Sequence, residues 1–173
     1  MADATDLDAL AHELLAASVS ALDTIPTFAP GLVGAPERSY VSLGEPAADC
    51  CPQLTVHVAG LSEAPLEAQQ DYAWLPYVQF IVTIFRCSPS GTDSKSGWIP
   101  PAVTALEETS AQGNADAWAL WIHLHNRVQQ RLLFSRCRRT VWDGVRPLPV
   151  SGGCAGWVLG VRASLDGYPE VLS

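Results

Sequence analysis

The chain has 173 residues, of which 48% are hydrophobic, 16% charged and 8% aromatic. This length and composition fit one folded domain with its own core, and they exclude a wholly disordered chain, a coiled coil and a collagen-like repeat. Eighteen acidic residues against ten basic ones give a formal net charge of −8 at pH 7. Such a charge disfavours a protein that wraps or condenses nucleic acid.

Membrane, secretory and zinc-binding classes are also disfavoured. No apolar run approaches the roughly 18 residues that a transmembrane helix needs, and Asp3, Asp6 and Asp8 stand where a signal peptide would carry positive charge. We therefore expect a soluble chain that is made in the cytoplasm and has no membrane partner. The five cysteines contain no Cys-x-x-Cys pair, so a structural zinc site is not expected.

The first element predicted is a helix from Thr5 to about Leu22, within a segment spanning residues 1–25. Thr5 followed by Asp8 resembles a capping box, and Pro26 is expected to end the helix. A narrow apolar stripe indicates a helix that lies on a sheet. The stripe consists of Leu7, Leu10, Leu14, Ala17, Ala21 and Ile25.

Three strands are predicted between residues 36 and 87, at Ser39–Leu43, Leu54–Val58 and Tyr77–Cys87, because apolar residues alternate with a period of two. In the second strand Thr55 and His57 point away from the aliphatic face. The third strand is largely apolar on both faces and so needs cover on both, such as a helix on one side and a neighbouring subunit on the other.

Two long loops are predicted around the third strand. The loop before it has about a dozen residues and carries Glu63, Glu67 and Asp71, and the loop after it runs from Ser88 to Pro101. Loops of this length in a small domain are often functional. We expect the second one to project from the body.

A second long helix, the core helix, is predicted over residues 113–136. Asn114 is a suitable N-cap, and Asp116 would lie in the first turn, where it suits the helix dipole. The predicted core face contains Ala117, Trp121, Leu124, Val128 and Leu132, with Trp118 and His125 beside it.

A connector that contains Pro147 and Pro149 leads to a final strand at 154–165. The order α-β-β-β-α-β predicts a single α+β domain over residues 1–173. It has two layers, a mainly antiparallel sheet packed by two long helices.

Cys50, Cys51 and His57 are the main candidates for catalysis, because a thiolate beside an imidazole is an activated nucleophile. Against this, His57 lies on a strand six residues away, and Pro52 follows Cys51 with no helix start to lower a thiol pKa. We therefore do not expect an enzyme, and a thiol-dependent enzyme remains the alternative from a different class.

Antiparallel pairing of the second and third strands around a loop centred near residues 68 and 69 places Cys50 opposite Cys87. That geometry allows either a disulfide or two packed thiols, and Cys137 and Cys154 are further partners. In a reducing cytosol, buried small residues are the default interpretation of these cysteines.

Neither a metal nor an organic cofactor is expected. His123 and His125 are two residues apart on a helix and point in different directions, so they cannot share a metal. His125 is expected to be a hydrogen-bonded core residue and His123 to be solvated. The glycines at 152, 153 and 156 precede a strand, whereas loops that bind phosphate follow a strand and open a helix.

Six of the ten basic residues lie between residues 127 and 146. A nucleic-acid patch would need solvent-facing aromatics among them, so an interface with an acidic partner is the preferred interpretation. For Arg127 and Arg131, cations at a solvated helix end are an equal alternative. The six are Arg127, Arg131, Arg136, Arg138, Arg139 and Arg146.

Several sequence segments, in this order along the chain, resemble actinobacterial phage virion proteins, specifically head-to-tail connector proteins. These segments are residues 36–41 (PERSYV), residues 44–54 (GEPAADCCPQL), Arg86–Cys87 at the end of a long strand, and residues 152–157 (GGCAGW) at the start of the final strand. The resemblance covers most of residues 36–165. Within that group the element order is similar to the tail terminator of long-tailed phages (siphophages).

The resemblance implies a structural protein of the virion neck, assembled in the host cytoplasm. It would form a hexameric ring that caps the tail tube and joins it to the head-side connector. Its partners would be other copies of itself, the major tail tube protein and the stopper, with DNA passing through the lumen without specific binding. The alternatives are another connector ring, either a stopper or an adaptor, and a host-derived soluble binding module.

For such a ring, we expect acids to face the lumen and arginines and exposed tryptophans to face neighbours, because these residues often anchor interfaces. The expected lumen acids are Asp3, Asp6, Asp8, Glu13, Glu63, Glu67 and Asp71. The expected interface residues are Arg136, Arg138, Arg139, Arg146, Trp74, Trp98 and Trp142.

Overall fold

The computed structural model describes residues 4–46, 52–65, 74–151 and 153–165. Its five-stranded main sheet has the order β1-β2-β3-β7-β6, with β1 parallel to β2 and the other pairs antiparallel. The predicted α+β class, with two long helices on a mainly antiparallel sheet, is confirmed. The elements are α1 (Ala4–Leu22), α2 (Ile25–Phe28), β1 (Ser39–Ser42), β2 (Gln53–Pro65), β3 (Trp74–Cys87), β4 (Thr92–Ser94), β5 (Gly97–Ile99), α3 (Val103–Gln129), β6 (Thr140–Ser151) and β7 (Cys154–Ser164).

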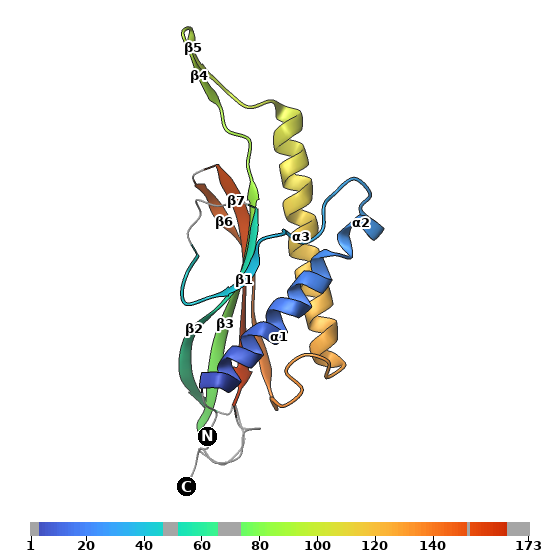
Figure 1. The fold of residues 1–173 in the computed structure, drawn as a ribbon, viewed down its shortest axis with the longest axis vertical. Coiled ribbons are helices and arrows are strands. Elements are labelled where there is room, and N and C mark those ends of the chain that lie inside the picture. Colours follow the sequence, from blue (N-terminus) through green and yellow to red (C-terminus); the bar gives the residue numbers. More distant parts are fainter. Residues whose placement is uncertain (1–3, 47–51, 66–73, 152, 166–173) are drawn as a thin grey trace.

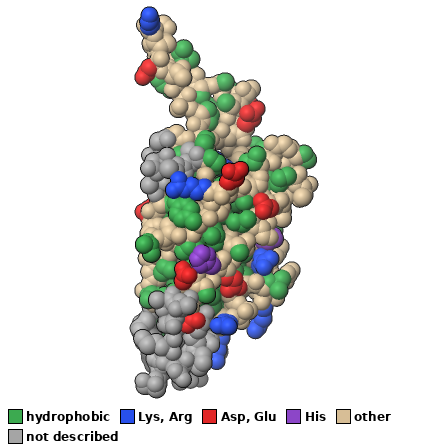
Figure 2. All heavy atoms as spheres, viewed as in Figure 1, with side chains coloured by type: hydrophobic (Ala, Val, Ile, Leu, Met, Phe, Trp, Pro, Cys, Tyr) green, Lys and Arg blue, Asp and Glu red, His purple; other side chains and the backbone are tan. Residues whose placement is uncertain are grey.

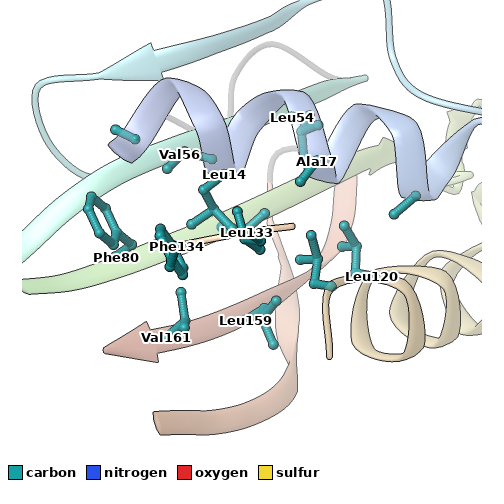
Figure 3. Packing of buried hydrophobic residues seen from close by; sticks show 14 of the residues in the cluster. Leu14, Ala17, Leu54, Val56, Phe80, Leu120, Leu133, Phe134, Leu159 and Val161 are labelled. Atoms are coloured by element: carbon teal, nitrogen blue, oxygen red, sulfur yellow. The ribbon is translucent and has the colours of Figure 1, made fainter. Parts of the chain in front are cut away.

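Both long helices pack on one face of the main sheet (Figure 1), which we call the inner face. The predicted stripe of α1 is confirmed: Leu14 and Ala21 are fully buried, and Leu10 and Ala17 nearly so. Side chains from α1, β2, β3, α3 and β7 meet in one apolar cluster, in which the ring of Phe80 stacks on that of Phe134 (Figure 3). Within the described residues, no helix is long and apolar enough to cross a membrane.

The first helix ends at Leu22, as predicted, but Pro26 is not what ends it. Pro26 lies in the first turn of the short helix α2. Backbone N–H groups in a first turn have no partner within the helix, so the missing N–H of proline costs no hydrogen bond there. Ile25 is nevertheless buried as the stripe predicts. The proline therefore starts a new helix where the sequence suggested a stop.

The helix α3 begins at Val103, not near Asn114, and ends at Gln129, not at residue 136. The misleading signal was Asn114, the expected N-cap, which lies inside the helix together with Gly113 before it. A Cβ at position 113 would come within 3.0 Å of the indole nitrogen of Trp157, so the glycine permits a close approach of α3 to β7. Beyond the helix, Arg131 adopts φ 57°, which ends the regular backbone.

The core face of α3 is rotated from the predicted one. Trp118 and Leu132 are 61% and 56% exposed, whereas the prediction placed both against or beside the core. The buried residues of the helix are Ala115, Asp116, Ala119, Leu120 and Leu124. Asp116, which the sequence placed in the first turn of the helix, lies on this buried face.

Asp116 is buried because it pairs with Arg86 at the end of β3. The guanidinium donates from Nε and Nη2 to the two carboxylate oxygens, at 2.9 and 2.8 Å. Nη2 also donates to the carbonyl of Gly34, and Gln112 donates to Asp116 Oδ1. Burial raises the pKa of Asp116, and the hydrogen bonds from Arg86 and Gln112 oppose this shift. The pair fastens α3 and the loop before β1 to the sheet.

The strands β2 and β3 are longer than predicted, reaching Pro65 and starting at Trp74. Glu63 therefore lies in β2 and not in a loop, while Glu67 and Asp71 fall outside the described residues. The register shifts once, between Val58 and Gly60. This bulge interrupted the strict alternation on which the prediction depended.

The strand β6 was not predicted, because Pro147 and Pro149 suggested a connector. The structure places β6 at the edge of the sheet, where its outer side has no ladder partner among the described strands. Proline lacks an N–H to donate, and an edge strand tolerates this because its outer side needs no donor for a ladder. The final strand, β7, matches its prediction to within one residue.

Candidate functional site

The candidate site lies on the outer face, the face of the main sheet opposite α1 and α3. Pairing aligns Thr55 on β2 with Thr83 on β3, Val158 on β7 and Arg146 on β6. The next row of the same face contains His57 opposite Ile81. Residues from four strands therefore place hydroxyl, imidazole, guanidinium and aliphatic groups together on one surface.

This surface contains a groove of about 580 Å³, which we call the outer groove. One side comes from the segment after β1, including Glu45, and from His57 and its neighbours on β2. The other side comes from β6, with Arg146 and Leu148, and Ile81 lies between them. The groove combines an apolar centre with an acid on one side and a base on the other.

His57 is the most unusual residue of the groove. His57 is only 5% exposed, yet its Nδ1 has no hydrogen-bond partner in the part of the chain that the structure describes. Burial lowers the pKa of His57, and the charge of Glu45 opposes this effect. The imidazole is therefore neutral at pH 7 and offers one donor and one acceptor nitrogen. Unpaired buried polar atoms are costly and call for an explanation, such as a missing partner.

Lowering the pH is expected to destabilise the fold through His57. The unfolded chain binds a proton near the ordinary pKa of 6.5, whereas the folded protein holds the imidazole neutral to lower pH. The free energy of unfolding should therefore fall as the pH drops through 6.5 toward the lowered folded-state pKa. Urea unfolding between pH 7.5 and 5 should show a shallower decline for His57→Gln. The exposed His12 gives the control His12→Gln, and an equal decline in all three proteins would contradict this role.

A second polar cluster continues along the outer face. Arg162 on β7 donates to Asp143 Oδ1 on β6 from Nε and Nη2, at 3.0 and 2.8 Å, and Gln79 on β3 donates to Asp143 Oδ2. Both members of this ion pair are about one-third exposed. A hollow of about 460 Å³ borders all three residues and shares Arg146 with the outer groove. The polar surface thus spans three neighbouring strands.

The segment after β3 projects from the body, as the sequence predicts. The strands β4 and β5 form a separate two-stranded hairpin that stands beyond the end of the main sheet (Figure 1). Trp98 and Ile99 are 64% and 51% exposed on it. The Trp98 ring lies directly over Gly91, where any Cβ would overlap it. The sequence suggested Trp98 as an interface residue but gave no sign of the hairpin.

The predicted basic cluster occupies the opposite end of the molecule, where basic side chains gather (Figure 2). Arg136, Arg138 and Arg139 are exposed there. Arg146 lies apart from them, on β6 in the outer groove. The six arginines are therefore two groups and not one patch.

Aromatic residues join α3 to β6. Trp142 is half-buried and contacts Trp121 edge-on, and His125 packs against both rings. His125 Nδ1 and His123 Nε2 are buried without hydrogen-bond partners in the described structure, so the expectation of a hydrogen-bonded His125 fails at that atom, and the expectation of a solvated His123 fails too. Burial, together with the charge of Arg127, lowers the pKa of His123. Trp142 thus contributes to internal packing.

The predicted lumen acids are only partly placed. Asp8 is exposed and Asp6 half-buried on α1, while Glu13 accepts a hydrogen bond from the backbone N–H of Phe134 at 3.0 Å. Glu13 therefore fastens the segment after α3 to α1. Asp3, Glu67 and Asp71 lie outside the described residues, and the side chains of Glu63 and Trp74 are not described. A lumen-facing role for these acids stays a prediction.

The cysteine predictions are also only partly placed. Cys50 and Cys51 lie outside the described residues, so packing of the Cys50 thiol against Cys87 and a pairing of either cysteine with His57 stay predictions. Cys154 is disulfide-bonded, whereas Cys87, which is exposed and lies opposite Cys154 in the register of β3 and β7, is not. The predicted disulfide of Cys87 is therefore wrong, and Cys154, which the sequence offered only as a further partner, forms one instead. Among the residues that are described, no group of three or more His, Cys, Asp or Glu could hold a metal ion.

Comparison of the chain with protein-family models finds no match, and comparison with curated protein sequences finds none that is significant. The site must therefore be interpreted from its own geometry.

Proposed function

We propose that the chain is a structural protein of a phage neck, a tail terminator that assembles into a ring on the tail tube. The observation that carries this proposal is the outer groove, a partly apolar surface in which buried polar atoms of Thr55 and His57 have no partner within the described chain. Such a surface indicates a macromolecular contact. The contact would be with a neighbouring subunit or ring.

The positions of the segments that resemble head-to-tail connector proteins support the same proposal. Residues far apart in the sequence lie side by side at one end of the sheet: Ser39 pairs with Leu54, Leu54 with Ile84, and Phe85 with Gly156. Three of the segments are thus on neighbouring strands at one end of the sheet.

The architecture also favours the terminator over the other connector rings. A stopper is expected to be a small β-barrel with a plug loop, and an adaptor a helical bundle. This chain has an open five-stranded sheet with both long helices on the inner face. Its net charge of −8 suits a ring through which DNA passes without sticking.

Capping of tail tubes tests the proposal. Purified tail tube protein should polymerise into long tubes alone, and adding this chain should stop growth and leave a ring at one tube end under negative stain. Ovalbumin, a soluble acidic protein that does not form rings, serves as the control. Tubes of unchanged length that do not sediment with the chain would contradict the proposal.

A thiol-dependent enzyme is the second candidate, because His57 lies neutral in a groove and an unprotonated imidazole can serve as a general base. It predicts that Cys50 or Cys51 reacts with iodoacetamide far faster in the folded than in the unfolded chain. His57→Gln should then slow the reaction. The ring proposal predicts ordinary reactivity, and capping that survives Cys50→Ser with Cys51→Ser.

A further inference from the structure

The hairpin formed by β4 and β5 presents a fixed apolar surface to solvent. Its turn is held by Ser94, whose hydroxyl donates to the carbonyl of Gly97 at 2.6 Å. Trp98 is held over Gly91, and all residues from Thr92 to Pro100 are exposed. A large aromatic group that is ordered yet exposed is typical of an interface anchor, because little side-chain entropy remains to be lost on binding.

The same hairpin carries one charge of each sign. Asp93 pairs with Trp98 across the hairpin, and Lys95, the only lysine of the chain, lies at its tip. The outer groove has the complementary pattern, with Arg146 on the β6 side, Glu45 on the β2 side and apolar groups between. Both hairpin charges therefore have an opposite charge available in the groove.

We infer that the hairpin of one copy docks in the outer groove of the next copy, with Trp98 on the apolar centre. Asp93 then faces Arg146, and Lys95 faces Glu45. The indole N–H, a donor only, has an acceptor available in the unprotonated nitrogen of His57. This inference rests on the proposed ring, and it names the contact that builds the ring.

A second copy suits this contact better than the same chain does. The hairpin stands beyond the end of the main sheet (Figure 1), and none of its residues lines the outer groove. Hairpin and groove are different surfaces, so a contact between them is head-to-tail. Contacts of that kind close into rings when the rotation between neighbours permits it.

Charge reversal tests the contact directly. Asp93→Arg and Arg146→Asp should each raise the concentration needed for ring assembly about 100-fold, because like charges then face each other. The double variant restores opposite charges at every contact and should assemble near the wild-type concentration. Glu108→Arg reverses an exposed acid on α3 and is the matched control, which should assemble as the wild type does.

Mixing two defective chains gives a second readout. Trp98→Ala has a weakened hairpin and an intact groove, whereas Arg146→Asp has the reverse. Each alone should be monomeric, but an equimolar mixture should form one-to-one dimers and no rings, as measured by analytical ultracentrifugation. All variants carry exposed substitutions, and matching thermal unfolding would show that they fold.

The outcomes separate this contact from the proposed function. The hairpin contact alone would be overturned if the wild type forms rings and both single variants assemble equally well. It would also be overturned if the wild type forms rings and the double variant stays monomeric. Loss of tube capping by Trp98→Ala with rings intact would assign the hairpin to the tail tube and also overturn it. A wild-type chain that neither forms rings nor caps tubes would remove the proposed function itself.

Discussion

Replacing Arg86 by alanine is expected to lower the free energy of unfolding by about 3–5 kcal/mol. The substitution leaves the carboxylate of Asp116 buried without its counter-charge, and Asp116 is 0% exposed. It also removes the donor to the carbonyl of Gly34, which fastens the loop before β1. Equilibrium unfolding in urea at pH 7 measures the change.

Two variants show whether the effect comes from the buried charge. Arg86→Ala combined with Asp116→Ala removes both charges and should be less destabilised than the single change, because no unpaired ion remains. Arg162→Ala breaks the partly exposed pair with Asp143 and should cost no more than about 1 kcal/mol. Equal losses for Arg86→Ala and Arg162→Ala would refute a special role for the buried pair.

Substitution of Gly156 by alanine should destabilise the sheet by about 3 kcal/mol, since overpacking at a backbone contact forces the strands apart. A Cβ at this position would overlap the carbonyl of Ile84 on β3. Backbone cannot move aside as the end of a flexible side chain does. Thermal unfolding followed by circular dichroism measures the loss.

Gly60 on β2 provides the matched control, because a Cβ there meets nothing within 4 Å. Gly60→Ala should change the free energy of unfolding by no more than about 0.5 kcal/mol. If both alanine variants unfold at the wild-type temperature, β7 does not approach β3 as closely as the structure shows.

Local patterns in the sequence predicted much of the fold. The stripe of α1 has regular spacing and no charged interruption, and the alternation in β3 separates Phe80 from Ile81 cleanly. The failures come from residues whose surroundings are distant in sequence. The glycine at position 113 inside α3 is explained by the close approach of Trp157. The burial of Asp116 is explained by its pairing with Arg86, thirty residues away. No local pattern reports such contacts.

The candidate site was less predictable than the fold. Alternation correctly placed His57 and Thr55 on the face opposite Leu54 and Val56. The β6 side of the outer groove was not predicted, because Pro147 and Pro149 suggested a connector in place of this strand. Arg146 was therefore grouped with the arginines at the far end of the molecule. The hairpin was hidden because its strands have only three residues each, which is too few to show a period.

The central claim is that this chain works by assembling with copies of itself around an axis. Native mass spectrometry of the purified protein at micromolar concentration tests it most directly. The claim predicts one dominant closed oligomer, with a mass that is a fixed multiple of 18.5 kDa and does not grow with concentration. A monomer at every concentration, both alone and with tail tubes present, would contradict it.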